Sequence, residues 1–255
     1  MLRLLRIEFL KVKTYKTFWA FLGIYALLIL LFSGAANKMN PAANPAFSLF
    51  SFPEVWHNLA YMASYLNILL GILVILLISN EFTFKTFRQN VVDGLSRDEA
   101  VTAKFLFIKA IALGCILFLF IYGLIRGLTA GGFDFIGQIF EQVHFLLRLF
   151  VQIAGYMGIA AVLAFLIRRA ALAIVAYLIY VIALERLLRF RIPDEIERYL
   201  PMHVLDALVP SKFEIPIPGF TEAEPLSTTI VVLLAIGYFL LCLTFSRLLM
   251  QRSAL

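Results

Sequence analysis

The sequence predicts an all-α membrane protein with six transmembrane helices. Of its 255 residues, 62% are hydrophobic and only 15% are charged, whereas a soluble domain carries about 25% charged residues. The mean hydropathy is +0.93. Charge-free runs recur along the chain, and most approach the length of about 20 residues that crosses the hydrocarbon core of a bilayer. We therefore expect a polytopic membrane protein with a single transmembrane domain over residues 1–255.

The six predicted spans follow these runs, and two runs are extended past a charged residue. The third run reaches full length when it includes residues 105–109, with Lys109 extending toward water. The fifth run reaches Leu188 if Glu185 and Arg186 lie at the membrane interface. The predicted spans are residues 17–33, 56–79, 105–125, 144–166, 170–188 and 228–249.

The distribution of basic residues predicts the orientation, because Lys and Arg favour cytoplasmic loops. The N-terminal tail, residues 80–104, the turn at 168–169 and the C-terminus hold 13 of the 22 basic residues but only five of the 16 acids. Both termini are therefore predicted to be cytoplasmic, as an even number of spans requires. We assign the net charge of +6 to this topology and to contact with anionic lipid, and we expect no nucleic-acid partner.

The first 16 residues predict an amphipathic helix at the inner membrane surface. Leu2, Leu5, Phe9 and Val12 have the spacing of one helical face, and five basic residues lie among them. A simple positively charged flank of the first span is the alternative. A cleaved signal peptide would also combine a basic start with an apolar run and would leave five spans; we favour a retained first span.

Residues 193–209 predict two short helices before the last span. Pro193 opens the first helical pattern, Pro201 separates it from the second, and Pro210 ends the second. The apolar residues of this segment are too few to form a core of their own. We therefore expect two re-entrant helices that dip into the outer leaflet.

The sequence carries no recognisable catalytic, nucleotide-binding or metal-binding pattern. The phosphate-binding loop requires a Gly-Lys step, and the chain contains none. The three histidines are isolated, and the two cysteines lie in predicted spans without the spacing of a metal site. We expect no catalytic residue, cofactor or metal on this chain.

Three polar residues inside the predicted spans are candidates for lining a substrate pathway: Asn67, Gln152 and Tyr177. Polar groups buried in a membrane mark pathways in many transporters. They also form interhelical hydrogen bonds that each stabilise a bundle by less than about 1 kcal/mol. Both interpretations stay open from the sequence.

The polar stretch between the second and third spans is the most informative part of the chain. Eight charged residues fall within residues 80–104. Its aromatic and aliphatic residues predict a short amphipathic helix, and Asp93-Gly94 predicts the turn that ends it. Ser96 and Glu99 have the spacing of a capping box at the start of the third span.

This stretch resembles the loop after the second span of ATP-binding-cassette (ABC) permeases of the type-2 superfamily, which export drugs and polysaccharides. The family has a Glu that leaves the second span, a Thr-x-Arg-like step, a Ser-Arg pair and a Lys at the start of the third span. The matching residues are Glu81, Thr86, Arg88, Ser96, Arg97 and Lys104. Lys85 stands where the family often has Gly, and Gly94-Leu95 replaces a common Pro-containing step. The N-terminal helix, six spans and two short outer helices extend the resemblance over nearly the whole chain.

The resemblance implies a permease subunit of a bacterial plasma-membrane exporter. Such a subunit forms half of a substrate pathway and pairs with a second permease. Two separate ATPase subunits would bind ATP and Mg and contact the coupling segment, residues 81–104, through the six matching residues. On this view, reversing the charge of Glu81 or Arg88 impairs coupling while the permease still folds. An intramembrane enzyme and a non-transporting membrane scaffold are the alternatives, and co-purification of an ATPase chain would distinguish the permease from both.

The predicted topology is testable by cysteine labelling. We expect an Asn90→Cys variant to react with a membrane-impermeant maleimide only after the cells are permeabilised, because residue 90 lies in the cytoplasmic coupling segment. Strong labelling of position 90 in intact cells would overturn the orientation.

Overall fold

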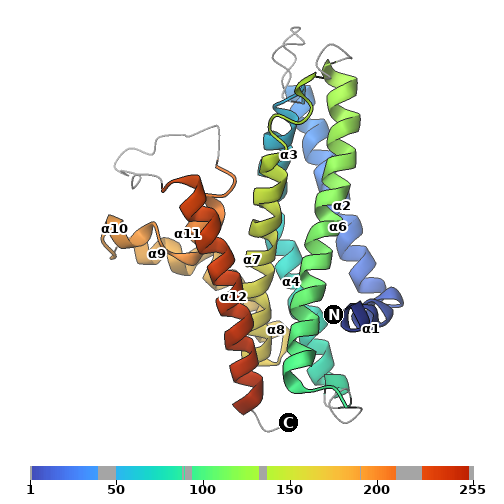
Figure 1. Cartoon of the computed structure of the whole chain (residues 1–255), viewed down its shortest axis with the longest axis vertical. Helices are drawn as coiled ribbons and strands as arrows, with labels where there is room; N and C mark the ends of the chain where they lie inside the picture. The colour runs from blue at the N-terminus through green and yellow to red at the C-terminus, as the bar shows by residue number, and fades with distance from the viewer. Residues whose placement is uncertain are drawn as a thin grey trace.

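The computed structural model describes residues 2–39, 50–87, 89, 94–131, 137–189, 191–210 and 226–252. The regular secondary structure of these residues is helical throughout, which confirms the all-α prediction. The longest helices run side by side along one axis (Figure 1). Helix α1 lies across this bundle near its base, and α9 and α10 project from the opposite side (Figure 1).

The helices of the described residues follow one another in this order: α1 (Leu2–Lys13), α2 (Lys16–Met39), α3 (Val55–Ser64), α4 (Asn67–Thr83), α6 (Arg97–Gly131), α7 (His144–Ile167), α8 (Ala170–Leu178), η3 (Ile179–Leu184), α9 (Glu185–Arg189), α10 (Asp194–Glu197), α11 (Pro201–Asp206) and α12 (Thr228–Arg252).

Four helices are long and apolar enough to cross a membrane, namely α2, α6, α7 and α12. Helices α3 and α4 add a fifth span if the bent pair counts as one. The run of α8 and η3 over Ala170–Leu184 is apolar but shorter than these spans. The part of the chain that the structure describes therefore supports a multi-pass membrane protein, while the count of six spans stays a prediction.

The predicted span 56–79 is two helices rather than one. Helix α3 ends at Ser64 and α4 begins at Asn67, and the two helices are bent by 48°. The Ser64 hydroxyl donates to the Tyr61 carbonyl oxygen at 2.7 Å, in the last turn before the break. The charge-free run contains no proline or charge to announce this break.

The third predicted span is longer than expected. Helix α6 extends from Arg97 to Gly131, whereas the predicted span covers residues 105–125. The bounds of α7 and α12 agree closely with the predicted spans 144–166 and 228–249.

Glu185, which we expected at the membrane interface, is buried inside the protein. Its side chain is buried at the junction of η3 and α9, and its residue exposure is 4%. The carboxylate accepts backbone N–H bonds from Met202 at 2.9 Å and His203 at 3.4 Å, and a hydroxyl bond from Tyr180 at 2.6 Å. The unpaired backbone N–H groups and the positive end of the helix dipole at the start of α11 stabilise the negative charge of this carboxylate. It thereby ties α9 to α11.

The two short helices predicted within 193–209 are present as α10 and α11. Leu205 of α11 packs against Gly155 of α7, where an added Cβ would lie 2.4 Å from the leucine side chain. The Tyr156 hydroxyl donates to the Asp206 carboxylate at 2.5 Å. Helix α11 is thus docked on α7, and its seating in the outer leaflet stays a prediction.

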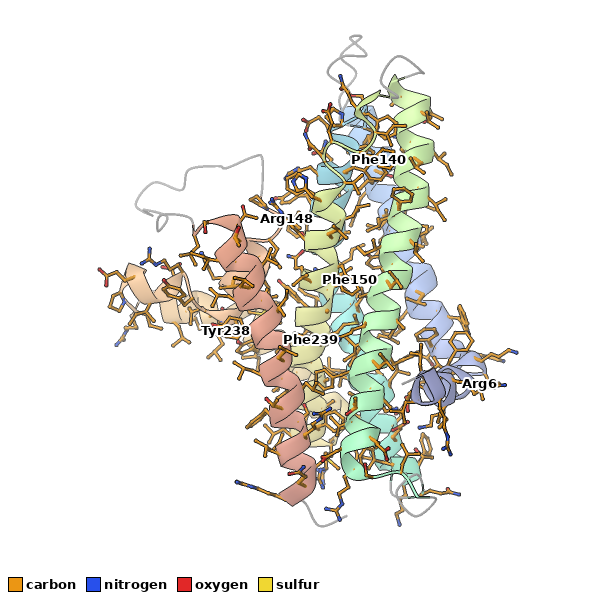
Figure 2. All side chains as sticks on the ribbon, in the orientation of Figure 1. Arg6, Phe140, Arg148, Phe150, Tyr238 and Phe239 are labelled. Atoms are coloured by element: carbon orange, nitrogen blue, oxygen red, sulfur yellow. The ribbon has the colours of Figure 1, made fainter. Side chains whose placement is uncertain are left out.

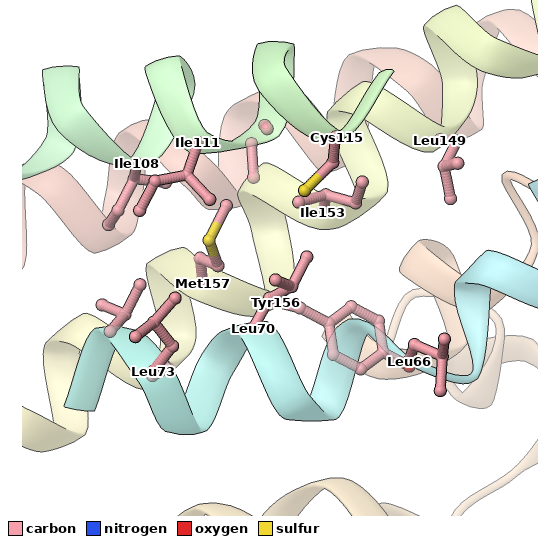
Figure 3. Packing of buried hydrophobic residues seen from close by; sticks show 14 of the residues in the cluster. Leu66, Leu70, Leu73, Ile108, Ile111, Cys115, Leu149, Ile153, Tyr156 and Met157 are labelled. Carbon is pink, nitrogen blue, oxygen red and sulfur yellow. The ribbon is translucent and has the colours of Figure 1, made fainter. Parts of the chain in front are cut away.

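The core lies where α4, α6 and α7 pack together. Met157 and Ile153 of α7 lie between Leu70 of α4 and the apolar side chains of α6 (Figure 3). A second close approach joins α4 to α8, because an added Cβ at Gly71 would lie 2.1 Å from the Tyr177 hydroxyl oxygen. The small residue at position 71 therefore sets the distance between these helices.

We expect Gly71→Ala to destabilise the protein by about 1–3 kcal/mol, the usual cost of overpacking a buried site. Thermal unfolding in detergent measures the effect as a lower midpoint. Gly114→Ala is the matched control, because a Cβ there meets nothing within 4 Å and alanine favours a helix by about 1 kcal/mol over glycine. A midpoint for Gly71→Ala equal to that of Gly114→Ala would contradict the close approach.

Candidate functional site

Four charged side chains from three helices meet at the base of the bundle and form what we call the charge cluster. Its members are Glu8 and Lys11 of α1, Glu81 of α4 and Lys104 of α6. Lys104 binds Glu8 and, at 2.5 Å, the Glu81 Oε1 atom. The Lys11 Nζ atom lies 3.0 Å from both Glu8 Oε1 and Glu81 Oε1. The cluster contains two acids and two bases, so its formal charge is zero.

The charge cluster is largely shielded from solvent. Glu8, Glu81 and Lys104 are 4%, 8% and 7% exposed, and a buried charge is costly unless it is paired. Each member therefore needs the others, and removing one leaves a charge without compensation. The Glu81 Oε2 atom is buried and has no hydrogen-bond partner among the described residues.

Local sequence explains how the members reach the cluster. Glu8 and Lys11 are three residues apart and so share one face of α1. Glu81 lies in the last turn of α4, and Lys104 lies two turns inside α6. Only part of the predicted apolar face of α1 packs against the bundle, since Val12 is buried and Phe9 is half exposed.

The α1 members of the cluster have shifted pKa values. Burial alone would raise the pKa of Glu8, but Lys104 and Lys11 outweigh it, and the pKa lies below its usual 4.5. Burial alone would lower the pKa of Lys11, but Glu81 and Glu8 outweigh it, and the pKa lies above its usual 10.5. The Glu8 contribution to stability is present above pH 4.5 and is lost as the pH falls through the folded pKa. The Lys11 contribution is present below pH 10.5 and is lost at still higher pH. The cluster therefore holds α1 throughout the neutral range.

A cavity of about 520 Å³ lies beside the charge cluster, between α1, α4 and α6. All four cluster members line it, and side chains such as Leu77 of α4 and Phe107 of α6 form its apolar wall. Phe84, Thr86 and Gln89 of the coupling segment also line this cavity. The cluster and the coupling segment therefore share one cavity.

In its second half, the coupling segment has the local structure that its sequence predicts. The Glu99 backbone N–H donates to Ser96 Oγ at 3.1 Å, and the Ser96 N–H donates to Glu99 Oε2 at 2.9 Å. This reciprocal pair confirms the capping box at the start of α6. Gly94 has φ 99°, a conformation that glycine adopts without strain, in agreement with the predicted turn.

Lys85 occupies a backbone conformation that favours glycine. Its φ is 57°, in the left-handed region that costs an L-residue with a side chain roughly 1–2 kcal/mol. Thr86 follows, and its hydroxyl donates to the Glu81 carbonyl oxygen at 3.4 Å. Glycine would adopt this conformation without strain, whereas Lys85 does so at that cost.

Arg97 binds the end of α12 rather than facing open solvent or lipid. Its Nη1 atom donates to the carbonyl oxygens of Met250 at 3.2 Å and Gln251 at 3.3 Å. The last carbonyls of a helix have no partner within the helix, so a guanidinium group is well suited to this place. The Gln251 amide in turn donates to the Asp98 carboxylate at 2.9 Å. The start of α6 is thereby joined to the end of α12.

Comparison with known protein families identifies the chain. Residues 4–184 match the family model described as ABC-2 family transporter protein. The chain belongs to this family. It is an ABC-2 permease. Members of this family are the membrane component of an ABC transporter and not its catalytic ATPase. No curated protein matches the chain significantly.

The structure describes five of the six predicted coupling residues, and it places them in different surroundings. Glu81 and Lys104 meet in the charge cluster, whereas Ser96 caps α6 and Arg97 binds α12. Thr86 is exposed, and Arg88 lies outside the described residues.

Sequence reasoning missed two members of the charge cluster, Glu8 and Lys11. Glu8 is the sole acid among the first 53 residues of the permease. This isolated acid on a basic amphipathic helix was the signal for a buried ion pair, because anionic headgroups at the membrane surface would repel its carboxylate.

The three candidate pathway residues lie inside the bundle. Asn67, Gln152 and Tyr177 are 0%, 1% and 0% exposed. Both polar atoms of the Asn67 amide, Gln152 Oε1 and the Tyr177 hydroxyl have no hydrogen-bond partner among the described residues. The interhelical hydrogen bonds offered as an alternative are therefore not formed by these atoms within this part of the permease. A role in a pathway stays a prediction.

We expect Lys104→Met to destabilise the permease by about 3–5 kcal/mol, because it leaves two buried carboxylates with Lys11 alone. The double variant Glu8→Met/Lys104→Met keeps the Lys11–Glu81 pair and should regain most of this loss. Thermal unfolding and the rate of trypsin cleavage within α1 measure both effects. Lys13→Met is the control, since Lys13 is exposed on the same helix. Wild-type stability in Lys104→Met would show that the cluster does not hold α1.

Proposed function

We propose that this ABC-2 permease is one of two permease subunits of an exporter in a bacterial plasma membrane, with both termini in the cytoplasm. Two separately encoded ATPase subunits would supply ATP hydrolysis, with ATP and Mg bound on those partners. The charge cluster carries the proposal, because it links α1, α4 and α6 beside the segment that resembles a coupling element. The second permease is either another copy or a homologue.

The residues of the coupling segment would then act in two ways. Phe84 is 73% exposed, and Lys85 and Thr86 are exposed beside it. We assign direct contact with the ATPase to these residues and to Arg88. Glu81 and Lys104 are buried, so we propose that they couple the movement of α1 to that of α4 and α6.

The physical basis of this transmission is the stiffness of the base. A push on the coupling segment displaces the last turn of α4 and the first turn of α6, which flank the segment. Since Lys104 binds Glu8 and Glu81 together, α1 must follow or the buried pairs must separate. Separating them would cost several kcal/mol, so the three helices move as one unit.

The interior of the bundle supports a change of state in the transport cycle. Unsatisfied buried polar groups each cost about 1–3 kcal/mol, and Asn67, Gln152 and Tyr177 carry such groups. A rearranged bundle, or a polar substrate group, would give these atoms partners. We therefore propose them as the polar part of this subunit's half of the pathway.

Reversal of Glu81 is a poor test of the ATPase contact. A third lysine in the buried cluster would repel Lys11 and Lys104, so we expect Glu81→Lys to impair folding. A Glu81–Lys104 pair was already one possibility from the sequence, and the structure contains it. Phe84 and Arg88 are better positions, because Phe84 is exposed and makes a small contribution to the core.

We expect Phe84→Asp and Arg88→Glu each to lower substrate-stimulated ATP hydrolysis of the reconstituted complex about tenfold or more, the scale of losing one interface hot spot. Phe140→Asp is the matched control, because Phe140 is 74% exposed and lies at the other end of the bundle (Figure 2). Co-purification with the ATPase chain is measured beside activity. Full hydrolysis and full co-purification of both variants would refute the coupling role of the segment.

A further inference from the structure

A second cavity lies at the base of the bundle, away from the charge cluster. Its volume is about 350 Å³, and it lies between the C-terminal ends of α7 and α12. This volume falls within the range of about 300–1,000 Å³ typical of small-ligand sites. Its apolar wall consists of Phe165 and Leu166 of α7 and Phe245, Leu248 and Leu249 of α12. We call this cavity the α7/α12 groove.

Two arginines complete the lining of the α7/α12 groove, and none of the described residues that line it is acidic. Arg168 follows the last residue of α7, and Arg252 is the last residue of α12. Neither arginine forms an ion pair with an acidic side chain among the described residues. This groove therefore carries uncompensated positive charge, whereas the cavity beside the charge cluster contains equal numbers of acids and bases.

Backbone carbonyl oxygens do not occupy either guanidinium group fully, so both groups can bind a ligand. Arg97 already binds the Met250 and Gln251 carbonyl oxygens at the end of α12, so Arg252 is not needed as a cap. The Arg168 guanidinium lies 5.4 Å from the Phe82 ring centroid, and its Nε atom donates weakly to the Phe165 carbonyl oxygen at 3.4 Å. Its Nη atoms have no hydrogen-bond partner among the described residues.

We propose that the α7/α12 groove binds an anionic phospholipid of the inner leaflet. A guanidinium group matches the geometry of a phosphate and donates two parallel hydrogen bonds to it. Basic pockets between transmembrane helices on the cytoplasmic side bind anionic headgroups, and the apolar wall would receive the upper part of an acyl chain. The leaflet assignment rests on the proposed orientation, but the binding itself does not depend on an ATPase partner.

The test uses the purified full-length permease and native mass spectrometry with added phosphatidylglycerol or phosphatidylcholine. The variant is Arg168→Gly/Arg252→Gln. Glycine is chosen because Arg168 has φ 55°, a conformation that glycine adopts without strain, so the turn is preserved. Each basic residue near an anionic surface contributes about 1 kcal/mol, or about fivefold, so we expect an affinity loss for phosphatidylglycerol of about 25-fold and little change for phosphatidylcholine.

The control removes the same charge elsewhere at this end of the protein. In Arg3→Gln/Arg6→Gln, both residues are exposed on α1, neither lines the groove, and Arg6 projects from α1 away from α12 (Figure 2). We expect a loss of less than about twofold, because screening weakens the effect of distant exposed charges. An equal loss in both double variants would assign the binding to diffuse surface charge and overturn the proposal.

A variant that alters shape and not charge tests the apolar wall. Leu248 is half exposed, and Leu248→Trp fills the groove while keeping both arginines, so it should also lose the preference for phosphatidylglycerol. Unchanged lipid binding would refute the groove as the site, and weakened self-association with unchanged lipid binding would assign the groove to a second copy of the chain. Displacement of the lipid by millimolar glycerol phosphate would show that a free phosphate, not a lipid, is the ligand.

Discussion

The compensation of buried charge between Glu8, Glu81 and Lys104, with Lys11 at the edge, is the constraint on which the base of this permease depends. Two carboxylates and two ammonium groups lie beside an apolar cavity, where no single one of them would be stable in its charged form. Their pairing determines the rotation of α1. The face with Glu8 turns inward, and Leu10, which is 58% exposed, faces away from the bundle.

The rest of the base is built around this constraint. The capping box holds the start of α6 in place, and Arg97 joins that start to the end of α12. The turn at Lys85 then brings the coupling segment back beside the cavity. Each contact is modest on its own, but together they connect α1, α4, α6 and α12. A partner that pushes on the coupling segment would therefore act on four helices at once.

The middle of the bundle differs from the base in how its polar groups are satisfied. At the base the charges pair, and at the start of α11 the Glu185 carboxylate receives three donors. Between α4, α7 and α8, the side chains of Asn67, Gln152 and Tyr177 retain buried polar atoms without partners among the described residues. Apart from the Glu81 Oε2 atom, which also lacks a hydrogen-bond partner among the described residues, the charges of the cluster are paired. This is the arrangement expected if the base transmits a movement and the interior rearranges, as in the proposed transport cycle.

The sequence alone was sufficient for features that depend on neighbouring residues. Hydropathy located α2, α6, α7 and α12, since a helix that crosses lipid must be apolar over its own length. The spacing of Ser96 and Glu99 predicted the capping box because both partners lie within one turn. The resemblance of the coupling segment to type-2 permeases rested likewise on a short stretch, and the family match confirmed it.

Only the tertiary structure decided the features that depend on distant residues. An amphipathic helix on its own cannot show whether its faces meet lipid or protein, so the pairing of Glu8 with Lys104, 96 residues away, was not predictable from α1. The same holds for Arg97, whose partners at the end of α12 are 153 and 154 residues away. The bend between α3 and α4 lies in a run without proline or charge, so the usual sequence signals of a helix break are missing and only the folded chain shows it.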